Sequence, residues 1–366
     1  MTRLTLFCLL SLLCIGAMGL VLPVDLLAGK PVVIENPKPT HIEKDSMYIQ
    51  LQRVGGVEED IDDQNFFGRP MDIMPDDRGG FFVFDSILDK IFSFDKDLKL
   101  RKVFIDHGIG PFEIRKKEGP FDRIYFSRDG NLYVISSQNH KIISFTSDAK
   151  PIREFRLYNY PIIAFLPVVD KSGNLFTISP TTYGIDVLDK NLKLRYSLLN
   201  KGEVNTWLIK SPRYDPHFPL GNPTCSGDLM YDVLLDGRLI VYFSRSSTIY
   251  IFKEGKLLKQ ANLWPERLFP EFLYQVEKAK KDPANIYTYV NMFWNFFVDK
   301  DNESFFYLFA ASHKTKQRWV YCFDLNCQLV NIYYFYPTDC LRIVAKRNQT
   351  FYGVTEVGVA LLKIKK

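Results

Sequence analysis

Three charged residues fall at equivalent places in a repeated pattern and are the clearest candidates for contacting a ligand. Asp72, Arg123 and Arg342 each occupy the same position in an apolar segment that precedes a polar turn. Function in repeat-built folds usually sits on the loops and inner strands that the scaffold presents. We therefore predict that these three side chains line a binding site, provided that the repeat brings them to one place.

A metal-dependent hydrolase would need oxygen ligands at those same positions. Calcium takes about six to eight oxygens, so one carboxylate does not suffice. The positions equivalent to Asp72 are Arg123, Leu166, Met230, Phe296 and Arg342. Two arginines there would repel a cation, so we predict no metal and no cofactor. The acidic run at residues 299–303 lacks the glycine of a calcium loop and is explained as a turn.

Other catalytic arrangements are absent from the sequence. It contains no Gly-x-Ser-x-Gly elbow, no His-Glu-x-x-His and no Gly-Lys-Ser/Thr phosphate loop, and its five histidines are scattered. The formal net charge of +5 is spread along the chain, whereas nucleic-acid binders gather Lys and Arg on one face. We predict no catalytic residue and no nucleic-acid partner.

Two long insertions interrupt the repeat. The first, at residues 201–226, contains Trp207 and His217, which we take as further ligand-binding candidates. The alternative is a packed connection that its aromatic residues anchor. The second contains residues 270–283, where bounding prolines, early acidic residues and late lysines predict one short helix.

The repeat itself has a period of roughly 40 to 50 residues, the size of one four-stranded propeller blade. Its plainest copy begins with a strand at residues 70–73 and a polar turn at residues 76–80. Alternating strands then follow at residues 81–85, 90–95 and 98–104, which predicts an antiparallel meander. The order recurs five more times, and the last copy is one strand short.

An unpaired strand before the first copy can supply the missing one. Residues 48–54 have the pattern of a strand that belongs to no complete unit. If this strand completes the last unit, the ring closes and no strand edge is left exposed. We predict an all-β, six-bladed β-propeller over residues 47–366, closed by its N-terminal strand and carrying one short inserted helix.

The repeat resembles the NHL-type six-bladed β-propellers, which include many exported bacterial propeller proteins. The likeness lies in residues 67–72, in the Asp-x-x-Gly turn before residues 81–85, in residues 90–95 and in the linker at residues 108–113. It extends from about Met47 to the C-terminus. The resemblance implies blade geometry and says nothing about chemistry. The strongest catalytic precedent among six-bladed propellers is a calcium-dependent lactonase or related hydrolase.

The N-terminus has the pattern of an export signal. An uncharged, mostly apolar stretch at residues 4–24 follows Arg3 and contains the small residues Ala17 and Gly19. We predict a signal peptide over residues 1–29, with an uncleaved membrane anchor as the alternative. Residues 30–46 are expected to be an extended leader. The protein would then be periplasmic or extracellular, touching a membrane only through an uncut N-terminus.

Four of the six cysteines lie beyond that leader. Cys225, Cys322, Cys327 and Cys340 allow three disulfide pairings in an exported chain, and the sequence does not choose among them. Cys327 falls where other repeats have Leu98 and Leu192, which predicts a buried apolar thiol.

Together these features predict an exported binding protein without catalysis. Its partner would be a protein, a peptide or a glycan that binds at the mouth of the central channel. The alternative is a calcium-dependent lactonase or related hydrolase of the same fold.

Overall fold

The computed structural model describes residues 32–34, 47–105, 108–114, 123–136, 141–156, 168–179, 184–199, 229–243, 248–263, 293–299, 301–311 and 317–365. The secondary structure of these ranges is built from β-strands, and none of them contains an α-helix. The helix predicted at residues 270–283 lies outside them, as do Trp207, His217 and Cys225. No helix among the described residues is long and apolar enough to span a membrane.

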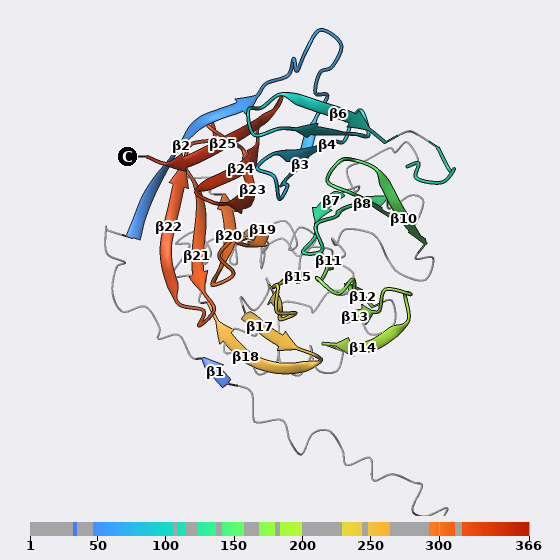
Figure 1. Cartoon of the computed structure of the whole chain (residues 1–366). Helices are drawn as coiled ribbons and strands as arrows, with labels where there is room; N and C mark the ends of the chain where they lie inside the picture. The colour runs from blue at the N-terminus through green and yellow to red at the C-terminus, as the bar shows by residue number, and fades with distance from the viewer. Residues whose placement is uncertain are drawn as a thin grey trace, which may run out of the picture.

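Antiparallel sheets stand around a central axis like the blades of a propeller (Figure 1). In each of the first three sheets, four strands follow in chain order from the axis outward. The first sheet has β3 (Pro70–Pro75), β4 (Phe81–Asp85), β5 (Lys90–Phe94) and β6 (Leu100–Phe104). The second has β7 (Arg123–Phe126), β8 (Leu132–Ser136), β9 (Lys141–Phe145) and β10 (Pro151–Arg156). The third has β11 (Val168–Val169), β12 (Leu175–Ile178), β13 (Ile185–Leu188) and β14 (Leu194–Leu198).

The fourth sheet gains a strand from the predicted leader. It contains β15 (Leu229–Val233), β16 (Leu239–Phe243), β17 (Thr248–Lys253) and β18 (Lys256–Asn262). At its outer edge β1 (Val32–Ile34) pairs with β18 in parallel. A short part of the segment expected to be extended is therefore a strand that covers a sheet edge.

The remaining strands form one eight-stranded sheet, here called the closing sheet. One half contains β19 (Phe293–Val298), β20 (Phe305–Ala311), β21 (Arg318–Asp324) and β22 (Leu329–Phe335). The other half contains β23 (Arg342–Arg347), β24 (Thr350–Val354), β25 (Val359–Ile364) and β2 (Tyr48–Val57). β2 joins the halves, because it lies between β22 and β25 (Figure 1).

The pairing of β2 confirms the predicted closure and adds a feature to it. From Leu51 to Val57 the strand runs antiparallel to β25, with Leu51 opposite Ile364. Its first residues instead pair in parallel with β22, with Tyr48 opposite Ile332. The predicted strand at residues 48–54 therefore completes the last unit only from Leu51 onward, and it also links that unit to the preceding one.

Apolar side chains pack between neighbouring sheets, which explains why the inner strands are buried on both faces. All five residues of β4, the second strand from the axis in its sheet, are buried. The outermost strand of the second sheet, β10, is mostly exposed. Phe82 and Phe126 stack across the first and second sheets, with ring centroids 6.0 Å apart. The ring centroids of Phe81 and of Tyr352 in the closing sheet are also 6.0 Å apart.

The predicted polar turns form through aspartate side chains. Oδ1 of Asp76 accepts hydrogen bonds from the backbone N–H groups of Arg78 and Gly80 at 2.9 and 2.7 Å. Asp170 and Asp299 bind the backbone of their own turns in the same way. Such Asx turns hold the hairpin between the inner strand and the next strand.

The outer hairpins use a second aspartate turn that needs a left-handed residue. Leu98, Leu192 and Cys327 have φ values of 65°, 62° and 59° at equivalent places. Cys327 is buried, as its alignment with the two leucines predicts. Cys322, Cys327 and Cys340 form no disulfide with one another.

Candidate functional site

The predicted channel-mouth residues lie on neighbouring inner strands. Asp72 is in β3, which lies between β7 and β23 around the axis (Figure 1). Nη2 of Arg342, the first residue of β23, donates a hydrogen bond to the backbone oxygen of Met71. Arg123 begins β7, where its backbone pairs with Ile135. The side chain of Asp72 is 1% exposed, which leaves it little surface for a ligand.

Arg342 also has a structural role, because its hydrogen bond to Met71 ties β23 to β3. That the channel mouth binds a partner stays a prediction, and Trp207 and His217 lie outside the described residues.

Polar side chains connect the second, fourth and closing sheets near the middle of the ring. The Tyr125 hydroxyl donates to Oδ1 of Asp232 at 2.8 Å, and Oδ2 of Asp232 accepts from the N–H of Val298 at 3.3 Å. Arg128 donates to the Val233 carbonyl at 3.0 Å. Burial, together with the Asp232 charge, raises the pKa of Tyr125 well above its usual value. These groups stabilise the contacts between inner strands.

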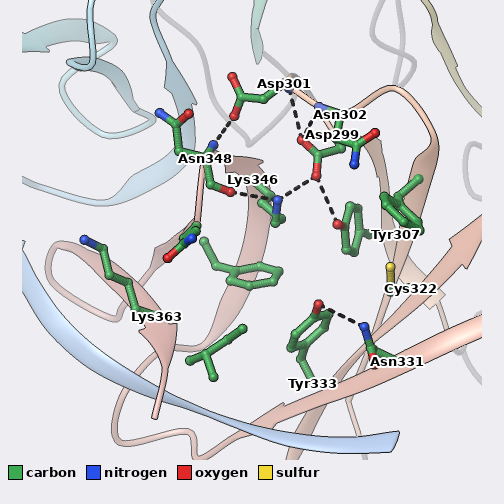
Figure 2. Close-up of a pocket in the computed structure, with 14 residues that line it drawn as sticks. Asp299, Asp301, Asn302, Tyr307, Cys322, Asn331, Tyr333, Lys346, Asn348 and Lys363 are labelled. Atoms are coloured by element: carbon green, nitrogen blue, oxygen red, sulfur yellow. Dashed lines mark hydrogen bonds and ion pairs between the residues drawn. The ribbon is translucent and has the colours of Figure 1, made fainter. Parts of the chain in front are cut away.

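A pocket of about 550 Å³ lies between the two halves of the closing sheet (Figure 2). We call it the closing-sheet pocket. Its lining comes from both halves and comprises Asp299, Asp301, Asn302, Phe305, Tyr307, Cys322, Asn331, Tyr333, Lys346, Asn348, Gln349, Phe351, Lys363 and Ile364. The volume is in the range typical of small-molecule sites, roughly 300 to 1,000 Å³.

A buried ion pair joins the two halves in this pocket. Nζ of Lys346 lies 2.6 Å from Oδ2 of Asp299 and 2.8 Å from the carbonyl oxygen of Asn348. The Tyr307 hydroxyl donates to the same Oδ2 at 3.1 Å (Figure 2). Since Oδ1 accepts two backbone hydrogen bonds of the turn, the Asp299 carboxylate is fully engaged. This arrangement satisfies the charges of both buried groups.

Three aromatic rings pack beside the ion pair. The Phe351 ring lies 6.1 Å from that of Tyr307, at 90°, and 4.9 Å from that of Tyr333. Nζ of Lys346 lies 5.8 Å from the Tyr307 centroid and 5.9 Å from the Phe351 centroid, within cation–π range. The rings give the pocket an apolar wall.

Burial keeps the acidic groups of this wall protonated. It raises the pKa of Tyr333 and of the Cys322 thiol to about 12 each. It also raises the pKa of Tyr307, with the Cys322 and Asp299 charges adding to the effect. These three groups are therefore protonated near neutral pH, and none is present there as a thiolate or phenolate.

Polar side chains surround the aromatic wall. Four of them are amides, namely Asn302, Asn331, Asn348 and Gln349. Nδ2 of Asn331 donates to the Tyr333 hydroxyl at 3.4 Å. Asp301 is occupied, because it accepts from the N–H of Asn348 and lies 3.4 Å from Nε of Arg347. Lys363 adds a positive charge from β25.

The sequence alone did not predict this pocket. Asp299 is the turn residue that the sequence predicts, but its ion pair depends on Lys346 from the next unit of the chain. Asn331 and Lys363 lie on β22 and β25 and meet only because the ring closes. The one feature of the sequence that points toward the pocket is the acidic run at residues 299–303. Among the described residues no group of three His, Cys, Asp or Glu side chains could hold a metal ion.

Comparisons with known proteins agree with the architecture. No protein-family model matches the chain, and no curated protein matches it. A predicted exported protein from Bacteroides fragilis has a similar structure, at 13% identity and a TM-score of 0.55, with 92% of this chain and 100% of that protein covered. The fold is a β-propeller.

A second match has a lower TM-score. Virginiamycin B lyase from Staphylococcus aureus, in a catalytically inactive form with quinupristin, shares 12% identity at a TM-score of 0.48. The alignment covers 86% of this chain and 99% of the lyase. At that score the match adds nothing to the fold assignment, and the Bacteroides likeness shows the fold alone.

Proposed function

We propose that the chain is an exported, non-catalytic β-propeller protein that binds a ligand in the closing-sheet pocket. The observation behind this proposal is that the pocket is large enough for a ligand, yet its buried ionic groups engage one another. Lys346 neutralises Asp299, and Tyr307 donates to the same carboxylate. A pocket of this kind provides shape and hydrogen bonds, and its described residues include no free general base.

The ring is proposed to have six blades of the NHL type. The closing sheet counts as two blades, because each half is an antiparallel meander of the kind seen in the four other sheets. The aspartate turns at Asp76, Asp170 and Asp299 support one repeated blade design. β2 then supplies the outer strand of the sixth blade.

Export is proposed from the leader. Residues 1–29 have the arginine, the apolar stretch and the small residues of a secretory signal. The structurally similar protein from Bacteroides fragilis is itself a predicted exported protein, which agrees with an exported location for this chain.

Blocking the pocket tests the binding function. In Asn331→Trp an indole would occupy the space beside Tyr333, whereas Asn191→Trp places the same group on an exposed turn of the third sheet. Each protein would be incubated with the soluble exported fraction of its host, and bound small molecules would be released and identified by mass spectrometry. We expect a ligand on the wild type and on Asn191→Trp, and at least tenfold less on Asn331→Trp.

Two results would contradict the proposal. Equal ligand loading on Asn331→Trp would place binding elsewhere, for example at the channel mouth. Chemical turnover of the ligand, or turnover of a lactone panel with stoichiometric calcium, would favour the hydrolase alternative.

A further inference from the structure

We propose that the ligand of the closing-sheet pocket is a neutral saccharide. This inference rests on the proposed function and adds the chemical class of the ligand. It follows from the charges, the polar groups, the apolar wall and the strand edges around the pocket.

The charges favour an uncharged ligand. The Lys346 ammonium and the Asp299 carboxylate compensate each other at 2.6 Å. Asp301 is engaged by Arg347 and by the N–H of Asn348. Of the charged residues that line the pocket, only Lys363, exposed on β25, has no ion-pair partner among the described residues. A charged ligand would therefore lose its hydration without gaining a partner deep in the pocket.

The polar rim matches hydroxyl groups. An amide side chain both donates and accepts hydrogen bonds, and so does a sugar hydroxyl. Among the described residues, none makes a hydrogen bond to the side-chain amide of Asn348 or Gln349. Asn331 uses only Nδ2, for Tyr333, so its Oδ1 remains available as an acceptor. Three amides can thus exchange water for the hydroxyls of a saccharide.

The apolar wall suits the other face of a sugar ring. Phe305 and Ile364, which are partly exposed, line the pocket, and the buried rings of Tyr333 and Phe351 lie beside them. Pockets that combine apolar and aromatic walls with a few placed polar groups bind ligands with both kinds of surface. The C–H face of a pyranose is apolar, whereas its edge is polar. One side of the ring can pack against this wall while its edge meets the amides.

An extended peptide fits the pocket less well. One common mode of peptide binding adds a strand to an exposed sheet edge and needs unpaired backbone groups there. β2 already pairs with β22 at Tyr48–Gln50 and with β25 from Leu51 onward. The N–H of Lys365 donates to the carbonyl of Gln50 at 2.9 Å, which closes the gap further. β2 therefore occupies the edge of β22 at Ile332–Tyr334 and the edge of β25 at Val359–Ile364, which leaves less free edge for an added strand.

Binding to defined sugars tests the ligand class. The purified chain would be applied to an array of neutral, uronic-acid and sulfated glycans, and the best neutral oligosaccharide would be titrated by calorimetry. We expect binding to neutral glycans that is lost in Asn331→Trp. Asn331→Ala and Gln349→Ala should each raise the Kd about fivefold, as expected for one lost hydrogen bond. Asn191→Ala should leave the Kd unchanged.

The outcomes separate this inference from the proposed function. A pocket ligand that proves to be a peptide, a nucleotide or an acidic glycan, and is lost in Asn331→Trp, would overturn the saccharide class and leave the binding function intact. Absence of any ligand that depends on the pocket would overturn both. Melting temperatures of all variants within a few degrees of the wild type would show that each protein is folded.

Discussion

The ammonium group of Lys346 lies 2.6 Å from Oδ2 of Asp299, so a strand of one half of the closing sheet neutralises a turn of the other half. The side chain of Asp299 is 1% exposed and that of Lys346 is 14% exposed. Such a pair fixes how the two halves meet, and it also fixes the electrostatic character of the pocket between them.

Replacing Lys346 by Met should destabilise the protein by about 3 kcal/mol, because Asp299 would stay buried without its counter-charge. Lys363→Met, on the exposed rim of the same pocket, should change stability by less than about 0.5 kcal/mol. Urea unfolding followed by tryptophan fluorescence gives both values. If the two variants lost equal stability, the Lys346–Asp299 ion pair would not be needed to hold the two halves of the closing sheet together.

Ring closure by β2 can be measured within one strand. Leu51 is 0% exposed and packs in the closing sheet, whereas Val54 in the same strand is 50% exposed. Leu51→Ala should lower the free energy of unfolding by about 3 kcal/mol through lost burial and a cavity. Val54→Ala should change it by less than about 0.5 kcal/mol. A small effect of Leu51→Ala in thermal and urea unfolding would show that β2 is dispensable for stability.

Acid should weaken the protein partly through Glu154. Burial opposes ionisation of this carboxyl, but hydrogen bonds from the N–H of Phe112, from Arg156 and from Lys141 outweigh it and lower its pKa. A lowered folded-state pKa gives stability that is present above the unfolded value of 4.5 and is lost as pH falls through the folded-state pKa.

The variant Glu154→Gln isolates that contribution. Its stability deficit relative to the wild type should be largest near neutral pH and should shrink as pH falls below about 4.5. Urea titrations at several pH values measure the difference. A deficit that stayed constant across this range would show that the effect is one of packing rather than charge.

The described cysteines should be inert in the folded protein. Burial raises the pKa of Cys322, Cys327 and Cys340 to about 12 each, so almost no thiolate forms at pH 8. Iodoacetamide at pH 8 should leave all three unmodified over an hour and should label them after unfolding in urea. Peptide mass spectrometry reports each site. Labelling of any of them in the native protein would indicate local opening of the segment that contains it.

Much of the fold could be predicted, because it depends on local patterns that repeat. Asp76 and Asp170 mark turns whose geometry their own side chains determine. The missing strand of the last unit pointed to residues 48–54, and β2 confirms that closure. Cys327 could be placed in the core because two leucines stand at its position in other units.

The pocket could not be predicted in the same way, because no local pattern specifies it. Lys346 meets Asp299 only when separate units of the chain are packed side by side. The pairing of Tyr48 with β22 also depends on that packing, since the sequence of β2 does not show where it changes partners. The periodicity of the sequence identifies the repeated units, whereas a pocket between two units depends on how their side chains pack in three dimensions.

The position of β2 in the chain has a consequence for biosynthesis. β2 is synthesised near the beginning, but its antiparallel partner β25 emerges from the ribosome some three hundred residues later, as the spacing of Leu51 and Ile364 shows. Until then the Leu51–Val57 part of β2 lacks the strand with which it pairs, and an unpaired strand can associate with other chains. A chain truncated before β25 should therefore leave the ring open and be more prone to aggregation than the full chain.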